Sequence, residues 1–259
     1  MEPVALRRFT QNAEKKILFC GDDNIDLAAI YLSSILYAEG YDFDYIPSAL
    51  QFPHELDINS YDLIIFSDYS RTQSTNKQLL AVKRYIENGG SFLMIGGWES
   101  FTGLNIEYKN SPIEDVLPVF LQDTDDCINY DQGIIVMQGK EKHPINRGLD
   151  WERPGIIGGY NAFIQKPGTE LCLLGVKMHI SNNQDAIQIQ FCEEDIPLLV
   201  IGNAEKGKVG ALAFDLAPHW IGGFIDWGKQ RKRINFNNGF IEVGDMYYRF
   251  VKNLIVSMF

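Results

Sequence analysis

Short apolar segments that alternate with helical patterns constrain the fold of this chain more than any other feature of its sequence. A continuous apolar run such as "YDLIIFSD" predicts a strand that is buried on both faces. Between such runs, apolar residues recur at the spacing of an amphipathic helix, and glycine follows where each helix is expected to stop. The first half of the chain therefore predicts a strand, a helix, two strands, a helix and a strand, at residues 15–21, 24–40, 41–47, 61–68, 76–90 and 91–97.

The second half of the chain is richer in strand patterns. A helix is expected to begin at Ser111, and a helix with one apolar face is expected at 245–259. The acidic segment 122–132 and the basic run 229–233 indicate solvated loops, with a divalent-metal site in the acidic segment as the less favoured alternative. The predicted strands of this half are residues 133–139, 170–175, 186–191, 197–203 and 207–215.

The alternation of strands and helices predicts an α/β fold with a mostly parallel sheet and helices on both faces. Because we find no linker, we expect a single domain over residues 1–259, with residues 1–14 as an N-terminal extension. The additional strands of the second half predict extra β-hairpins.

Charge and cysteine usage exclude several classes of protein. The net charge of −11 makes a nucleic-acid backbone or an anionic membrane an unsuitable partner. The four cysteines are widely spaced and form no C-x-x-C pair, so neither a disulfide framework nor a zinc site is expected. We find no signal-peptide pattern and no apolar run of transmembrane length in the sequence. We therefore expect a cytoplasmic protein, and we expect it to have no cofactor or metal.

Three short motifs match known signatures only in part. "GNAEKGKV" (202–209) has the spacing of a phosphate-binding loop, but Val209 replaces the Ser or Thr and a strand follows it. "GDDNID" after the first strand has one glycine and lacks the dinucleotide fingerprint. In "GGWESFTG", Ser100 lies three residues from each flanking glycine, whereas a hydrolase elbow requires two. None of the three motifs therefore predicts its usual function.

Several longer segments occur in an order that is specific as a set, although no single one is diagnostic. They are "YDLIIFSDY", "YIENGGSFLMIGGWESFTG", "SPIEDVLPV", "HPINRGLDW", "GGYN", "PLLVIGNAEKGKVGALAFD" and "APHW". In this order they resemble the class I glutamine amidotransferase-like proteins, and more narrowly an uncharacterised branch of that family. The resemblance covers roughly residues 15–257 and implies a flavodoxin-like, doubly wound fold.

The resemblance also implies where a nucleophile would lie. In active members a cysteine occupies the centre of G-x-C-x-G after a strand, and a histidine followed by a glutamate activates it. Here Gly96 takes the first glycine, and Trp98 or, one register on, Glu99 takes the cysteine position. His219 matches the histidine, but "WIGG" replaces the residues that normally follow it, and Asp215 is the remaining candidate to orient it. Glutaminase activity by the family mechanism is therefore not expected.

Polar side chains follow four of the predicted strands, at 20–24, 67–71, 96–100 and 215–220. In a parallel open sheet, ligands bind beyond the carboxyl ends of the strands, so these loops are expected to form one crevice. Acidic groups beside tryptophans suit a polyol, sugar, amide or cationic ligand. The catalytic candidates are His219, Glu99 and Asp215, and the ligand-binding candidates are Asp22, Asp23, Asp68, Gly97, Trp98, Ser100 and Trp220.

Each candidate also has a structural interpretation. Asp22 and Asp23 fit helix caps, and Asp68 fits a turn cap. The two tryptophans fit packing anchors, and His219 fits a half-buried histidine that is satisfied by a neighbour.

Three functions remain open on these residues. The favoured one is an amidotransferase-like module without glutaminase activity that binds a small molecule or a partner. The second is a hydrolase of a non-glutamine substrate that uses Glu99 or Asp215 with His219. The third is a structural subunit of a homo-oligomer, for which the C-terminal segment "MYYRFVKNLIVSMF" would supply apolar surface.

Overall fold

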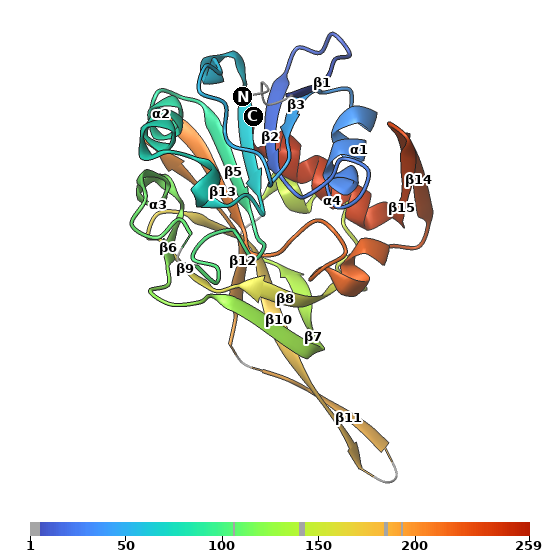
Figure 1. Ribbon diagram of the computed structural model, residues 1–259. Helices are drawn as coiled ribbons and strands as arrows, with labels where there is room; N and C mark the ends of the chain where they lie inside the picture. The colour runs from blue at the N-terminus through green and yellow to red at the C-terminus, as the bar shows by residue number, and fades with distance from the viewer. Residues whose placement is uncertain (1–5, 106, 140–142, 184–185, 193) are drawn as a thin grey trace.

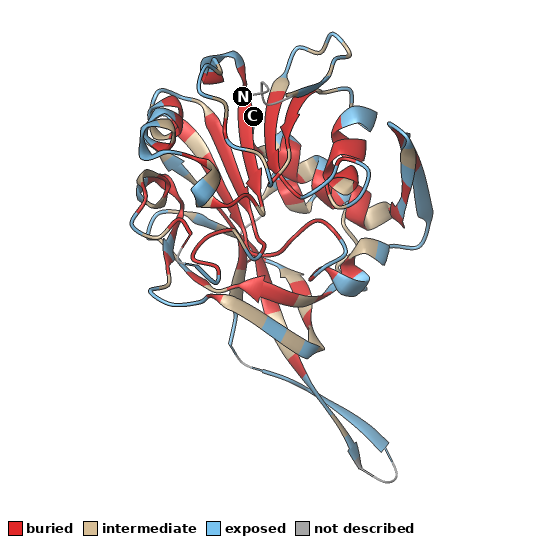
Figure 2. Cartoon of the chain, in the orientation of Figure 1, coloured by how far each residue is buried: buried red, intermediate tan, exposed pale blue. Residues whose placement is uncertain are grey.

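The computed structural model describes residues 6–105, 107–139, 143–183, 186–192 and 194–259 (Figure 1). Its centre is an 11-stranded sheet with the order β1-β3-β2-β4-β5-β13-β12-β10-β7-β8, and β11 pairs with β10 at the end that leaves the body. The buried residues follow this sheet through the body of the molecule (Figure 2).

Five neighbouring strands of the sheet are parallel and form its buried centre. Every residue of β4 and β5 is buried, as their continuous apolar sequences predict. The spatial order places the first strand of the unit between the second and the third, which is the doubly wound, flavodoxin-like arrangement. The predicted fold class is therefore confirmed. The five strands are β3 (Asp42–Ile46), β2 (Lys16–Gly21), β4 (Leu63–Ser67), β5 (Ser91–Ile95) and β13 (Gly207–Leu212).

Antiparallel strands extend the sheet on both sides and form the extra hairpins that the second half predicts. β1 (Arg7–Phe9), inside the predicted N-terminal extension, adds an edge strand to β3. Two smaller sheets pair β14 with β15 and β6 with β9. The remaining antiparallel strands are β6 (Val119–Leu121), β7 (Cys127–Gln138), β8 (Ile156–Asn161), β9 (Phe163–Gln165), β10 (Glu170–Asn183), β11 (Ala186–Phe191), β12 (Ile196–Ala204), β14 (Arg231–Phe236) and β15 (Gly239–Gly244).

Helices cover the sheet from two sides (Figure 1). α1 (Ile30–Ala38) and α4 (Asp245–Ser257) contact each other on one side, and α2 (Asn76–Glu87) and α3 (Pro112–Val116) contact each other on the other side. α2 begins with a capping box in which Thr75 and Gln78 satisfy each other's backbone N–H groups. Among the residues that the structure describes, each helix is too short or too polar to cross a membrane.

α4 uses its apolar face for the core of the protein. Its buried residues include the whole predicted face, which is Tyr247, Phe250, Val251, Leu254 and Ile255. The C-terminal segment therefore does not present that face to a partner, and the reason for expecting an oligomer from this segment is removed.

Three local predictions are wrong. The helix expected from residue 24 begins only at Ile30, because Asn24 accepts backbone N–H groups in a turn that precedes it. The loop predicted at 122–132 ends early, since β7 begins at Cys127. The basic run at 229–233 enters β14, whose Ile234 and Phe236 are buried while the basic residues that precede them face water.

Candidate functional site

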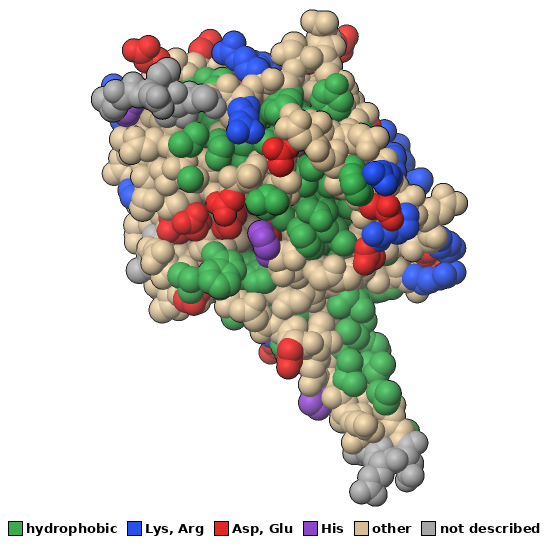
Figure 3. Space-filling view, turned by 45° about the vertical axis from the view of Figure 1, so that its right-hand side comes forward, with side chains coloured by type: hydrophobic (Ala, Val, Ile, Leu, Met, Phe, Trp, Pro, Cys, Tyr) green, Lys and Arg blue, Asp and Glu red, His purple; other side chains and the backbone are tan. Residues whose placement is uncertain are grey.

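A cavity of about 630 Å³ opens beyond the carboxyl ends of the parallel strands, where open α/β sheets bind ligands. The loops after β2, β4 and β13 line it, together with the start of α1 and the tip of the β14–β15 hairpin. Figure 3 shows one face of the molecule, on which acidic side chains and a histidine lie beside a group of hydrophobic side chains. The acidic lining residues are Asp22, Asp23, Asp26 and Asp68.

Gly21 allows β2 and β4 to approach closely at the base of the cavity. A Cβ atom at Gly21 would lie 1.6 Å from the carbonyl oxygen of Ser67, and its φ of +132° is a conformation that suits glycine. The next residue, Asp22, has a φ of +48° and donates its backbone N–H to the same oxygen over 3.0 Å. This close approach fixes the buried Asp22 carboxyl group in the cavity wall.

Asp22 and Asp23 do not cap α1, contrary to their structural interpretation. The N-cap residue of α1 is Ala29, and no side chain caps it. Burial raises the pKa of Asp22 well above its usual value, and the charges of Asp215 and Asp68 add to this effect. Asp23 instead accepts a hydrogen bond of 2.7 Å from the Ser48 hydroxyl. Both aspartates are therefore positioned in the cavity rather than used for the helix.

Asp68 joins the loop after β4 to the turn after β5. Its Oδ1 accepts the backbone N–H of Glu99 over 2.7 Å, and its own backbone N–H donates to Ser100 Oγ over 3.1 Å. Burial raises the pKa of Asp68 to about 6, against the hydrogen bond from Glu99, and the charge of Asp215 raises it further. Burial and the charge of Asp68 likewise raise the pKa of Glu99 to about 6. Asp68 thus caps the turn after β5 and also lines the cavity.

Asp215 and His219 form a hydrogen-bonded pair after β13. His219 Nδ1 lies 2.8 Å from Asp215 Oδ2, and Asp215 Oδ1 accepts the backbone N–H of Ala217 over 2.7 Å. Asp215 is buried, whereas the His219 side chain is 57% exposed and lines the cavity. The hydrogen bond that His219 donates to Asp215 raises the pKa of His219 against the effect of burial. With Nδ1 held by Asp215, Nε2 is the ring nitrogen available to a ligand or water.

The turn after β5 is tight because Gly96 meets the backbone of another segment and Gly97 meets the Asp68 side chain. A Cβ at Gly96 would lie 2.5 Å from Ala213 O, and one at Gly97 would lie 2.4 Å from Asp68 Oδ1. Asn161 of β8 holds the turn from the other side by accepting the Gly97 N–H over 2.9 Å and donating to the Gly97 carbonyl over 3.1 Å. Sequence reasoning misses Asn161, because "GGYN" does not have the pattern of a strand.

The remaining candidates, Ser100, Trp98 and Trp220, differ in how far they are buried. Ser100 is buried, and its hydroxyl donates to Ile95 O over 2.6 Å, so it supports the turn. Trp98 is 55% exposed and is not a packing anchor. Trp220 is buried and packs against Gly159, so the anchor interpretation holds for this tryptophan alone. Neither Trp98 nor Trp220 lines the cavity.

Tyr31 and Phe240 supply the apolar and aromatic walls that the tryptophans were expected to supply. Tyr31 belongs to α1, and Phe240 lies on β15 at a side-chain exposure of 49%. Asn237, beside the tip of the hairpin, donates to Asp26 Oδ1 over 2.7 Å and links the hairpin to the start of α1. Phe240 could not be assigned from sequence, because nothing in the pattern predicts that this hairpin crosses to the carboxyl ends of the strands.

A family model described as "putative glutamine amidotransferase", GATase1-like, matches residues 19–238. The chain belongs to this family. No curated protein sequence matches the chain. The order of the strands agrees with the flavodoxin-like fold that the resemblance implies.

Solved structures similar to this GATase1-like chain include two from Salmonella typhimurium. The cytoplasmic protein STM1381 of strain LT2 is 27% identical, with a TM-score of 0.71 over 94% of this chain and 99% of that chain. The cytoplasmic protein STM3548 is also 27% identical, with a TM-score of 0.69 over 94% of this chain and 98% of that chain. A ThuA-like protein from Parabacteroides merdae, 12% identical, has a TM-score of 0.56 over 95% of this chain and 90% of that chain, which shows the shared fold.

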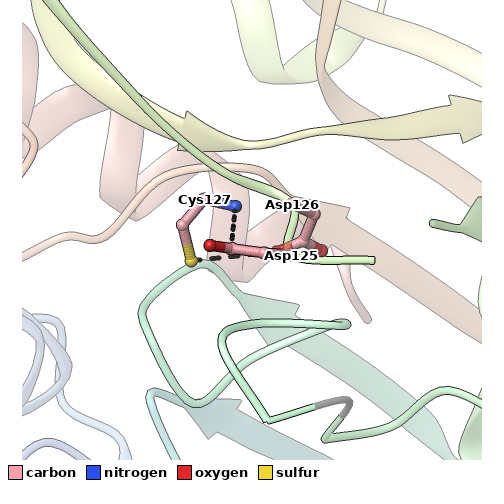
Figure 4. Close-up of side chains that lie close together, drawn as sticks. All are labelled: Asp125, Asp126 and Cys127. Carbon is pink, nitrogen blue, oxygen red and sulfur yellow. Dashed lines mark hydrogen bonds between the residues drawn. The ribbon is translucent and has the colours of Figure 1, made fainter. Parts of the chain in front are cut away.

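Cys127 is the cysteine nearest to the turn in sequence, and it also contacts a residue that holds the turn. Asn161 Nδ2, which donates to the Gly97 carbonyl, lies 3.7 Å from Cys127 Sγ. Burial raises the pKa of the Cys127 thiol far above its usual value, and the neighbouring carboxylates, first that of Asp126, add to this effect (Figure 4). A thiol that stays protonated is a poor nucleophile. The surroundings of Cys127 in this GATase1-like chain therefore favour the thiol over the thiolate.

Of the two acidic residues beside Cys127, Asp126 holds the turn. The carboxylate oxygens of Asp125 and Asp126 and Cys127 Sγ lie within 4.8 Å of one another, a spacing that a metal ion would also allow. The Asp126 carboxylate, however, already accepts the backbone N–H groups of Thr102 and Gly103, each over 2.9 Å, and Asn161 Nδ2 over 2.8 Å. These three donors compensate the buried charge, and we interpret Asp126 as a structural residue.

Proposed function

We propose that this protein is a GATase1-like module that binds a small molecule in the acidic cavity and does not hydrolyse glutamine. The observation that carries the proposal is a group of carboxylates at this cavity. Asp22 and Asp68 line it, burial raises the pKa of both, and the charge of the buried Asp215 raises both further. Carboxylates that are crowded and buried in this way are held at a cost in stability, which a bound cation or hydrogen-bond donor would offset.

The lining favours a small ligand with amino or hydroxyl groups on a partly apolar frame. Asp22, Asp23 and Asp68 accept hydrogen bonds from such groups, and His219 can exchange a proton with them. Tyr31 and Phe240 offer aromatic faces, which pack against sugar rings and attract cations. We therefore propose an amino sugar, polyol or small amine as the ligand class. The similarity to two proteins named cytoplasmic supports a cytoplasmic location for this module.

Purified protein is expected to release no ammonia from glutamine above the background without enzyme. Trp98 and Glu99 occupy the cysteine position of the turn, and neither has a thiol. The surroundings of Cys127 keep its thiol protonated. A coupled ammonia assay against a known glutaminase as positive control measures this directly. Ammonia release at an enzyme-like rate would overturn the proposal, and loss of that release in Cys127→Ser would identify the nucleophile.

The Asp215–His219 pair supports a second candidate function, a hydrolase that activates water rather than a thiol. A histidine whose Nδ1 is held by a buried carboxylate is positioned to act as a general base through Nε2. If a panel of esters, amides and glycosides yields turnover, His219→Ala is expected to lower its rate by about 100-fold or more. The exposed His54, replaced by alanine, is the matched control. Turnover that survives His219→Ala would exclude this candidate.

A further inference from the structure

A two-stranded arm projects from the body of the protein. The first part of β10 lies in the main sheet, where it pairs with β12 and β7 as far as Lys177. Beyond that point it pairs with β11, and the pairing runs from Met178 opposite Phe191 to Asn183 opposite Ala186. We call 178–183 and 186–191 the arm. It stands away from the other elements and is largely exposed (Figures 1 and 2).

One face of the arm is apolar although it lies in solvent. Side chains alternate between the two faces of a strand, and directly paired residues share a face. Ile189 therefore shares a face with its partner Ile180 and with the alternate residues Ile187 and Phe191 of β11. The exposed fractions of these four residues lie between 40% and 71%. Hydrophobic side chains continue along the arm in the space-filling view (Figure 3).

The opposite face of the arm is polar and uncharged. It carries His179 paired with Gln190, and Ser181 paired with Gln188. No Asp, Glu, Lys or Arg occurs at 178–182 or 186–192, the described residues of the arm and its continuation. Charged side chains are the usual protection of an exposed strand edge against pairing. The described part of the arm therefore lacks the feature that keeps such edges apart.

An exposed two-stranded ribbon is only marginally stable in water by itself. The arm is nevertheless a direct continuation of β10, so its base is anchored in the main sheet. A contiguous apolar face on such a projection indicates an interaction surface.

The distribution of charge indicates what covers this face. The chain carries a net charge of −11, so two copies repel each other over most of their surfaces. Residues 178–183 and 186–191 include no Asp, Glu, Lys or Arg, so a second copy can pack against the apolar face of the arm without placing like charges in direct contact there. The chain exposes 12637 Å², whereas a folded monomer of its mass exposes about 11,500 Å², and the projecting arm contributes to this larger surface.

We propose that the apolar face of the arm packs against the same face of a second copy of this chain, which makes the protein a homodimer. Ile180, Ile187 and Ile189 then form the centre of an interface in which the same surface is used by both subunits. The proposal does not depend on the ligand cavity, and the C-terminal helix, whose apolar face is buried, takes no part in it.

Sedimentation equilibrium of the full chain tests this proposal with two matched variants. Ile189→Glu adds a carboxylate to the apolar face, and Gln190→Glu adds the same charge to the polar face one residue away. The unmodified protein is expected to be dimeric, Ile189→Glu is expected to raise the dissociation constant of the dimer by about 100-fold or more, and Gln190→Glu is expected to change it by about threefold or less. Circular dichroism confirms that each variant is folded.

Three results would overturn the proposal. The first is an unmodified protein that stays monomeric over a wide range of concentration, as it would if the arm binds a different protein. The second is a dimer that Ile189→Glu and the independent variant Ile187→Glu leave intact, since both positions are exposed in the subunit and neither variant is expected to unfold it. The third is equal weakening by Ile189→Glu and Gln190→Glu, which would reflect charge alone.

Discussion

Replacing Gly21 with alanine is expected to destabilise the protein by at least about 3 kcal/mol. The added Cβ would lie 1.6 Å from Ser67 O, inside any permitted contact, and the φ of +132° is strained for every residue with a side chain. Relief requires β2 and β4 to separate where they carry Asp22 and Asp68 into the cavity. Urea unfolding monitored by circular dichroism measures the loss of free energy.

Gly40 provides the matched control for this substitution. It also has a positive φ, +81°, but a Cβ atom added there would have no neighbouring atom within 4 Å. Gly40→Ala therefore isolates the backbone strain and is expected to cost about 1 kcal/mol. Equal losses in Gly21→Ala and Gly40→Ala would contradict the account of the close approach between β2 and β4.

Replacing Asp68 with asparagine is expected to stabilise the protein by about 1–3 kcal/mol at pH 8. The pKa of Asp68 is raised from 3.8 to about 6 in the folded state, chiefly by burial. The folded state therefore holds the proton more tightly than the unfolded chain does. The resulting penalty on folding is absent below about pH 4, grows as the pH rises, and is complete above about pH 6. Asparagine removes the charge, and its Oδ1 can still accept the Glu99 N–H.

The pH dependence separates this explanation from a general effect of substitution. At about pH 3 the gain in unfolding free energy from Asp68→Asn is expected to vanish, because Asp68 is then mostly protonated in both states. Asp131→Asn, at an exposed position of β7, is expected to change stability by less than about 0.5 kcal/mol at either pH. An Asp68→Asn variant that is less stable than the unmodified protein at pH 8 would show that the charge supports the fold. A gain at pH 8 would fit a carboxylate retained for binding.

The parallel centre of the fold could be predicted because its strands are buried on both faces. The sequences of β2, β4 and β5 are therefore continuously apolar, because no face of these strands needs polar residues to contact water. β14 and β8 could not be predicted in the same way. β14 is largely exposed and begins with three consecutive basic residues, and β8 contains two glycines, so each resembles a loop in sequence.

The candidate site was predictable where it depends on the topology of the sheet. Asp22, Asp68 and His219 meet because parallel strands end at one edge, and strand ends are visible in the sequence. Phe240 reaches the cavity from a hairpin near the C-terminus, a long-range placement that local patterns do not encode. Trp98 was expected in the cavity wall and does not line it. Its position at a predicted turn does not determine the direction of its side chain, which is exposed.

A thermal-shift panel of amino sugars, polyols, small amines and amides tests the central claim, which is that the acidic cavity binds a small molecule. The panel is applied to the unmodified protein, to His219→Ala, which alters the cavity, and to the exposed control His54→Ala. A ligand at about 100 times its dissociation constant is expected to add about 2.7 kcal/mol. For a chain of this size that is a rise in Tm of several degrees.

The rise is expected in the unmodified protein and in His54→Ala, and it should be lost or strongly reduced in His219→Ala, each variant being compared with its own ligand-free Tm. A panel without any rise in the unmodified protein, or a rise that His219→Ala leaves unchanged, would contradict the assignment of this cavity as the binding site.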